Sequence, residues 1–133
     1  MQKINNLDNV NYLDLLDLRT AKGYDTLSTY HAMLFPTIHP SEGFSGIFID
    51  AFVSGLPILA SAWSYNAEFI PHGKLGIIYP SHDAKALADS MEDCILGKTD
   101  LDTMTINARN EADKYRSDMV VTWDFLKTIG LTG

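Results

Sequence analysis

Two short runs of the sequence are apolar at every position, and they constrain the fold more than any other feature. These runs are AMLF at 32–35 and PILA at 57–60. A strand with one face in water alternates apolar and polar residues, whereas a strand covered on both faces is apolar throughout. Such runs alternate here with longer helical patterns, as in parallel strands linked by helices. The sequence therefore predicts an α/β fold with a Rossmann-like parallel sheet flanked by helices.

The spacing of apolar and turn residues predicts four strands, at 10–13, 32–36, 57–61 and 75–79. Between and after them we expect helices at 23–30, 46–54, 66–70, 83–96, 101–115 and 118–129. Ser81 is the expected N-cap of the helix at 83–96, and Asn66 that of the helix at 66–70. Tyr24, Leu27 and Tyr30 share one helical face, which predicts that they lie in the core. The last helix has more apolar surface than a terminal helix usually buries, so we expect it to pack on something.

Length, charge and cysteine content limit the classes of function. With 133 residues, of which 46% are hydrophobic, residues 1–133 should form a single domain. A formal charge of −7 with scattered basic residues argues against binding to nucleic acid or to anionic membranes. The single cysteine, Cys94, has no partner for a disulfide and no neighbours at metal-ligand spacing. We therefore expect a cytoplasmic protein without a bound metal, and no apolar run reaches the roughly 20 residues that span a bilayer.

The segment HPSEGFSGIFIDAFVSGLPILAS at 39–61 carries most of the functional information. It places Glu42 and Asp50 around a turn that is bracketed by Gly43 and Gly46 and opens a helix. Glycines let the backbone turn sharply and leave its N–H groups uncovered, and the start of a helix carries a partial positive charge. This arrangement predicts a binding site for a phosphate group.

Each of the two acidic residues has a structural as well as a functional interpretation. Asp50 interrupts the apolar run IFIDAFV, where a carboxylate requires a hydrogen-bonding partner. It either caps nearby amides or points to solvent, or it accepts hydrogen bonds from ribose hydroxyls. Glu42 either serves the helix dipole alone or contacts the ligand. Phe44 either walls off a bound sugar or packs beneath the turn.

Taken together, these residues resemble the C-terminal, donor-binding half of GT-B retaining glycosyltransferases of family 4 (group 1). That family has an acidic residue, a Gly-aromatic-small-Gly turn, a second acidic residue eight positions after the first, and a strand of the type G-x-P-V-x-A-S. The counterparts here are Glu42, the turn at 43–46, Asp50 and the run GLPILAS at 55–61. Trp63, Asn66, Glu68, Gly73, Gly76 and Pro80 also match, and the resemblance covers about residues 8–96.

The resemblance implies a site and a reaction. Glu42 would be the catalytic residue that contacts the donor sugar and its phosphate, and Asp50, in place of the more usual Glu, would bind ribose. The turn and helix start would hold the sugar hydroxyls and the diphosphate, through Gly43, Phe44, Ser45, Gly46 and Ile47. The enzyme would transfer a sugar from a nucleotide sugar to an acceptor hydroxyl with retention, in polysaccharide biosynthesis, without a metal or other cofactor.

Three parts of such an enzyme have no counterpart in this sequence, so residues 1–133 would be a partial domain. These are the first strands of the donor domain, the basic pair that neutralises the diphosphate, and the N-terminal acceptor domain, which would be a partner. Arg19 and Lys22 fall in a loop that we expect to be solvated. Groups that stabilise the negative charge on the leaving phosphate supply much of the rate acceleration of such an enzyme. We therefore expect the isolated chain to be weakly active or inactive. The alternatives are a non-catalytic nucleotide-sugar-binding or structural remnant, and a nucleotide-sugar epimerase of the same fold. An exposed sheet edge and the C-terminal helix predict self-association.

Overall fold

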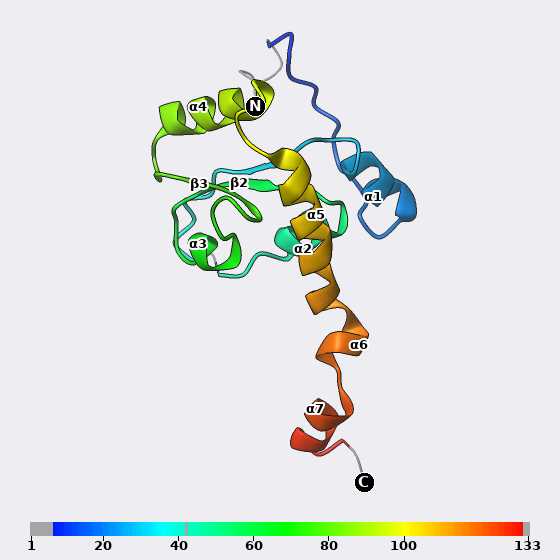
Figure 1. Ribbon diagram of the computed structural model, residues 1–133. Coiled ribbons are helices and arrows are strands. Elements are labelled where there is room, and N and C mark those ends of the chain that lie inside the picture. Colours follow the sequence, from blue (N-terminus) through cyan, green and yellow to red (C-terminus); the bar gives the residue numbers. More distant parts are fainter. Residues whose placement is uncertain (1–6, 42, 132–133) are drawn as a thin grey trace.

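The computed structural model describes residues 7–41 and 43–131 of the chain (Figure 1). Three parallel strands form the sheet, in the order β1 (Met33–Phe35), β2 (Ile58–Ser61) and β3 (Gly76–Tyr79). The helices that precede, link and follow them are α1 (Ala21–Leu27), α2 (Gly46–Val53), α3 (Asn66–Phe69), α4 (Ala84–Ile95) and α5 (Leu101–Ala112). A 3-10 turn, η2 (Asp113–Tyr115), then leads to α6 (Ser117–Val120) and α7 (Trp123–Thr128).

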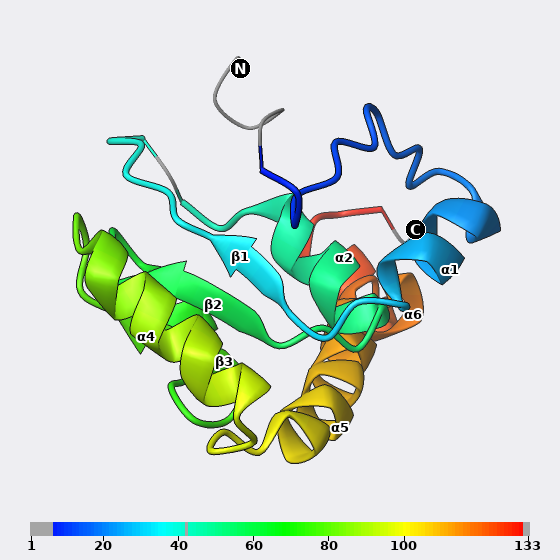
Figure 2. The ribbon, with the colours of Figure 1, turned by 90° about the horizontal axis from the view of Figure 1, so that it is seen from above.

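Helices cover both faces of the sheet, with α2 and α5 on one side and α4 on the other (Figure 2). The core between α2, α5 and the sheet contains Phe48, Phe52, Ile58, Ala60 and Ala108, all fully buried. All four residues of the central strand β2 are buried, as its continuous apolar run predicts. The expected α/β class, with a Rossmann-like parallel sheet flanked by helices, is confirmed.

The expected strands at 32–36, 57–61 and 75–79 are confirmed, whereas the one at 10–13 is wrong. Residues 10–13 have no regular structure, and Val10, Tyr12 and Leu13 are exposed. A strand is stable only beside a neighbour that takes up its backbone hydrogen bonds, and no described segment pairs with residues 10–13. The described sheet therefore has three strands instead of the expected four.

The helix caps and the C-terminal helix also differ from the sequence-based expectations. Asp83, not Ser81, caps α4, because its carboxylate accepts a hydrogen bond from the Ala86 amide at 2.9 Å. The expected helix at 118–129 is divided into α6 and α7. The division falls at Thr122, whose hydroxyl accepts a hydrogen bond from the Phe125 amide at 3.2 Å and starts a new helix.

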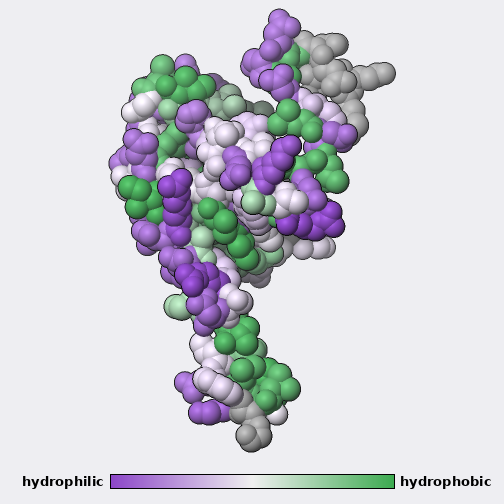
Figure 3. Space-filling view, turned by 90° about the vertical axis from the view of Figure 1, so that its right-hand side faces the viewer, coloured by the Kyte–Doolittle hydropathy of each residue, from purple (hydrophilic) through white to green (hydrophobic). Residues whose placement is uncertain are grey.

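Residues 116–131 project from the body of the molecule as a tail (Figures 1 and 3). Apolar side chains on this tail are exposed to solvent, namely Met119, Val120, Val121, Trp123, Phe125, Ile129 and Leu131. Figure 3 shows them gathered toward its far end. The described part of the chain does not cover the apolar surface of its last helix, which the sequence predicted to pack on something.

Gly55 sets the sharp turn between α2 and β2. Its φ of 72° lies in the left-handed region, its amide donates to the Phe52 carbonyl at 2.9 Å, and the Leu56 amide donates to the Ala51 carbonyl at 2.8 Å. These two bonds form a Schellman motif, which satisfies the last carbonyls of a helix and favours glycine at this position. The turn therefore fixes where α2 ends relative to the central strand.

Candidate functional site

The first turn of α2 presents backbone N–H groups without protein acceptors. Ser45 is the N-cap residue but makes no side-chain capping bond, and the Phe48 amide donates to the Ser45 carbonyl at 3.0 Å. Among the described residues, no acceptor bonds the amides of Gly46 and Ile47, and both residues are exposed. A helix start of this kind attracts negatively charged groups.

The glycines of the turn act through the space that they leave open. A Cβ atom added at Gly43 or Gly46 would meet no atom within 4 Å. Gly46 has no positive φ, so the turn does not depend on left-handed backbone at this glycine. The missing side chains instead leave the surface above the first turn of α2 accessible to a ligand.

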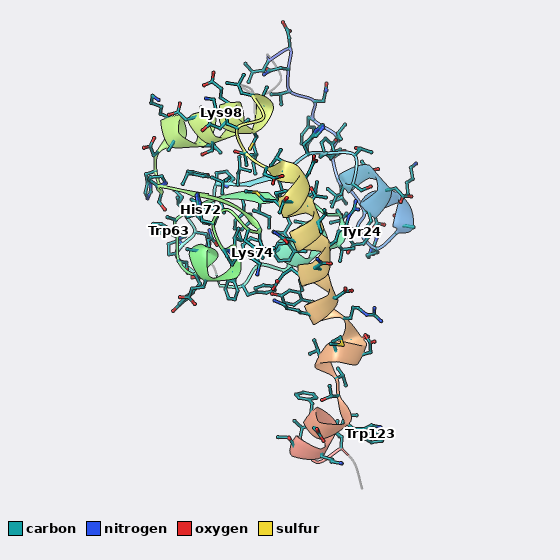
Figure 4. All side chains as sticks on the ribbon, viewed as in Figure 1. Tyr24, Trp63, His72, Lys74, Lys98 and Trp123 are labelled. Carbon is teal, nitrogen blue, oxygen red and sulfur yellow. The ribbon has the colours of Figure 1, made fainter. Side chains whose placement is uncertain are left out.

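The chain that leads into this turn is tied to the carboxyl end of β2. The Ser61 hydroxyl donates to the Thr37 carbonyl at 2.5 Å, and the Trp63 indole N–H donates to the His39 carbonyl at 2.8 Å (Figure 4). His39 also accepts a hydrogen bond from the Ser41 amide at 3.3 Å through Nδ1. Glu42, the expected catalytic residue, lies outside the described residues, and its role stays a prediction.

Asp50 has the hydrogen-bonding partner that its place in an apolar helix requires. The Tyr24 hydroxyl of α1 donates to Asp50 Oδ1 at 2.7 Å, and both side chains are half-buried (Figure 4). This bond and the adjacent carboxylate raise the pKa of Tyr24, as does its burial. Among the described residues, nothing donates a hydrogen bond to Asp50 Oδ2. One carboxylate oxygen is thus held by the protein and the other is available to a ligand.

The expected core face of the helix at 23–30 is only partly correct. Leu27 packs against the core, but Tyr24 makes a polar contact with Asp50. Tyr30 lies beyond the end of α1 and is 48% exposed. The expected helix was three residues too long at its C-terminus, which removes Tyr30 from the helical face.

Phe44 packs beneath the turn, which is one of its two predicted roles. Its ring lies edge-on to Phe48 and Phe69, with centroids 5.8 Å and 4.9 Å away, and is stacked on Tyr115 at 5.4 Å. These contacts hold the turn against α2, α3 and η2. These ring contacts thereby also hold the backbone of Phe44, which directly precedes the N-cap residue Ser45.

Arg19 is engaged away from the head of α2. Its guanidinium donates to both carboxylate oxygens of Asp17, at 2.8 Å and 3.0 Å, and its side chain is 90% exposed. Lys22 is exposed as well. Arg19 thus lies in a solvated turn, as predicted, whereas Lys22 is exposed but belongs to the first turn of α1, so the predicted loop is wrong for Lys22.

Sequence reasoning missed two anchoring side chains near the site. Trp63 ties the loop before Glu42, and the tendency of a tryptophan N–H to find an acceptor was the available signal. Asn66 was expected to cap α3, but Tyr65 is the N-cap residue. The buried Asn66 amide instead donates to the Ser61 carbonyl at 3.0 Å and closes the turn after β2.

Within residues 7–41 and 43–131, no group of three or more His, Cys, Asp or Glu side chains could hold a metal ion. In the same part of the chain, no helix combines the length and apolar character that crossing a bilayer requires. The longest described helices, α4 and α5, have 12 residues each.

Comparison with known proteins assigns the chain to a class of enzymes. Residues 2–96 match the family model of the group 1 glycosyl transferases, and the chain belongs to this family. The matched segment contains the three strands, helices α1 to α4 and the whole turn at the head of α2. The resemblance inferred from the motif at 42–61 is thus confirmed.

One protein with a similar sequence is the capsular polysaccharide biosynthesis glycosyltransferase CapM of Staphylococcus aureus. The two proteins are 26% identical over 108 residues, which cover 79% of this chain and 28% of the relative. The chain therefore spans less than a third of the length of this relative. No solved structure matches the chain significantly.

Proposed function

We propose that this chain forms the donor-binding part of a retaining GT-B glycosyltransferase. Such an enzyme would transfer a sugar from a nucleotide sugar to an acceptor hydroxyl during polysaccharide biosynthesis. The observation that carries the proposal is the head of α2, where no described residue accepts from the amides of Gly46 and Ile47 and the space beside Gly46 is open. This turn lies inside the segment that matches the glycosyltransferase family.

The chemistry of the site fits a sugar diphosphate. Breaking the bond between a sugar and its diphosphate develops negative charge on the leaving phosphate, and preorganised N–H donors stabilise that charge. The amides from Phe44 to Ile47 would supply such donors at the positive end of α2. Glu42 would contact the sugar and its phosphate as the catalytic residue. Retention of configuration is part of the proposal and rests on the family resemblance.

Asp50 is suited to the ribose of the donor. It lies one helical turn after Gly46, and therefore on the same side of α2 as the turn. Its Oδ2 atom has no donor among the described residues and could accept hydrogen bonds from ribose hydroxyls. The donor would then contact α2 at two places, with the phosphates at the first turn and the ribose at Asp50.

The activity of the isolated chain is expected to be low. The chain covers 28% of its capsular relative, and Arg19, one of the two basic residues considered for the diphosphate, is bound to Asp17. We propose that an N-terminal acceptor domain is the partner that completes the enzyme, and that neither a metal nor another cofactor takes part. The cytoplasmic location expected from the single cysteine also stays a prediction.

A non-catalytic nucleotide-sugar-binding protein is the second candidate. It is favoured by Arg19, whose guanidinium is held by Asp17 and therefore does not meet the charge of a leaving phosphate. The two candidates differ in turnover. Release of the nucleoside diphosphate from a nucleotide sugar that the chain binds would support an enzyme, and binding without release would support the second candidate.

A thermal-shift screen with UDP, GDP, ADP and their sugars tests the proposed site. We expect at least one nucleotide to stabilise the wild-type chain and the stabilisation to fall in Glu42→Ala and in Asp50→Ala. Glu92→Ala is the matched control, because Glu92 is an exposed acidic residue on α4, away from the turn. A shift that persists unchanged in Glu42→Ala and Asp50→Ala would show that the site is assigned wrongly.

A further inference from the structure

Helix α1 contributes a side chain to the site that neither the motif nor the family match assigns a role. We propose that Tyr24 is a positioning residue, which holds the Asp50 carboxylate ready for the ribose hydroxyls of a nucleoside diphosphate sugar. This inference rests on the proposed function, because it concerns the same donor site. It follows from the contact between the two side chains and from the way in which α1 is fixed.

The contact joins two elements that lie far apart in the sequence. The Tyr24 hydroxyl lies 2.7 Å from Asp50 Oδ1, and the two residues are 26 positions apart. This distance is typical of a hydrogen bond from a hydroxyl to an ionised carboxylate, which is stronger than a bond between neutral groups. The Tyr24 hydroxyl is protonated at neutral pH, and thus a donor, because the ordinary pKa of tyrosine is about 10.

The backbone beside Tyr24 is tightly constrained. Gly23 is buried, and a Cβ atom added there would lie 2.2 Å from the Asp17 carbonyl oxygen. The Thr20 hydroxyl accepts a hydrogen bond from the Gly23 amide at 3.2 Å and donates to the Asp17 carbonyl at 2.9 Å. The start of α1 is therefore clamped one residue before Tyr24, so the tyrosine ring extends from a fixed base.

A fixed partner is useful to an aspartate at this position. An ionised carboxylate offers about four lone-pair sites, so a bond to Oδ1 leaves Oδ2 free to accept from a ligand. Without Tyr24, the Asp50 side chain would sample other rotamers, and ordering it would reduce the affinity for the ligand. Tyr24 thus acts through Asp50 and need not touch the nucleotide itself.

Binding of UDP and of 2′,3′-dideoxy-UDP by calorimetry tests the inference in the full chain. If the thermal-shift screen favours GDP or ADP, that nucleotide and its dideoxy analogue replace the uridine pair. We expect Tyr24→Phe to weaken ribonucleotide binding about three- to tenfold, the size of one net hydrogen bond. The dideoxy nucleotide, which has no ribose hydroxyls for Asp50, should bind Tyr24→Phe and wild type equally.

A double-mutant cycle separates positioning from general damage to the site. Because Tyr24 acts through Asp50, Tyr24→Phe combined with Asp50→Asn should bind the ribonucleotide no more weakly than Asp50→Asn alone. Tyr30→Phe is the matched control, since it also removes one tyrosine hydroxyl, from a half-exposed residue just after α1. That variant should bind like wild type.

The outcomes distinguish this inference from the function on which it rests. If the wild-type chain binds none of the nucleotides, the proposed function fails and the role of Tyr24 with it. The role of Tyr24 alone is overturned if wild type binds but Tyr24→Phe binds equally well. It is also overturned if Tyr24→Phe weakens both nucleotides alike, or if its effect adds to that of Asp50→Asn.

Discussion

Gly46 and Gly55 mark the two ends of α2, and the chain needs glycine there for different reasons. At Gly46 the surroundings are open, so a side chain would extend into the space proposed for the donor. At Gly55 the backbone has a φ of 72°, and an added Cβ atom would lie 2.6 Å from Arg109 Nε. Gly55 therefore serves folding, and we propose that Gly46 serves binding.

Alanine substitution should separate these two roles. Gly46→Ala should leave the unfolding temperature unchanged or slightly raised, and should reduce the stabilisation by nucleotide. Gly55→Ala should lower the free energy of unfolding by about 1–2 kcal/mol, the cost of a left-handed residue with a side chain. Urea unfolding with and without UDP measures both effects. Loss of stability in Gly46→Ala would contradict the assignment of this glycine to the site.

The pKa of Tyr24 gives a prediction for the pH dependence of stability. The folded state raises this pKa above its ordinary value of about 10, mainly through the bond to Asp50. The resulting stabilisation is complete below pH 10 and is lost as the pH rises from 10 through the raised value. The stability difference between wild type and Tyr24→Phe in urea unfolding should therefore shrink at high pH.

Tyrosinate absorbance provides a direct measurement of the same effect. Titration of wild type and Tyr24→Phe gives the difference spectrum of Tyr24, free of the other tyrosines. In an Asp50→Asn background the pKa from this difference should move down toward 10, because the negative charge and its hydrogen bond are gone. An unchanged value would mean that the two side chains do not interact in solution.

At the scale of single residues, the sequence predicted which side chains require a hydrogen bond better than it predicted which group forms that bond. Asp50 within IFIDAFV required a hydrogen bond, and it has one. Its donor, Tyr24, could not be identified, because the contact depends on how α1 packs on α2. Asn66 was expected from its residue type to cap α3, but its side-chain amide instead donates to the Ser61 carbonyl, five residues earlier.

At the scale of elements, the loop at 37–41 leads into the turn at 43–46, which we propose to bind the donor. Trp63 holds this loop from the far end of β2 through a single N–H donor, and its ring also lies edge-on to His82 at 5.6 Å. Replacing the indole by a phenyl ring would keep an aromatic ring while removing the hydrogen bond. A conservative substitution can therefore measure the contribution of this bond to the free energy of unfolding.

We expect Trp63→Phe to lower the free energy of unfolding by about 1 kcal/mol, the net value of one hydrogen bond. Stabilisation by nucleotide should fall as well, because the loop that precedes the turn is no longer fixed. Trp123→Phe is the matched control, since Trp123 lies on the projecting tail and is 71% exposed (Figure 4). Equal effects of the two substitutions would argue against a supporting role for Trp63.

The elements themselves were predictable where local pattern and tertiary environment agree. The continuous apolar runs located β1 and β2, but only β2 is covered on both faces as predicted, since Leu34 in β1 is 45% exposed. The run at 10–13 has strand-like composition but no described neighbour to pair with. The break between α6 and α7 was missed, because Thr122 was treated as part of a continuous helix.

At the scale of the whole molecule, several apolar surfaces of the described residues are uncovered, and two of them stand out. The first is the tail at 116–131. The second is a hollow of about 440 Å³ beside α4, over the open face of β1, lined by residues that include Leu34, Met91 and Ile95. The final helix was expected to pack, and both it and α4 leave part of their apolar surface exposed. The sequence predicted the layers of the fold but could not show how completely they cover one another.

We expect the chain to self-associate through this uncovered surface, because exposed apolar patches and open sheet edges favour pairing with a second copy. Sedimentation velocity should show a weight-average mass that rises with protein concentration. Trp123→Ser combined with Phe125→Ser should shift the equilibrium toward monomer, because both side chains lie exposed on the tail. Ile106→Ser, an exposed apolar position on α5, is the control. A wild-type chain that stays monomeric at every concentration would contradict this expectation.

The outer position of β1 has a consequence for the exchange of its amide protons with deuterium. The Met33 amide donates to the Pro57 carbonyl, so the Leu34 N–H, one residue further along the strand, points away from β2. Leu34 should therefore exchange quickly although it belongs to a strand, whereas the amides of β2, between two neighbours, should exchange slowly. Slow exchange at Leu34 would report that another segment had docked along this edge, whichever molecule supplied it.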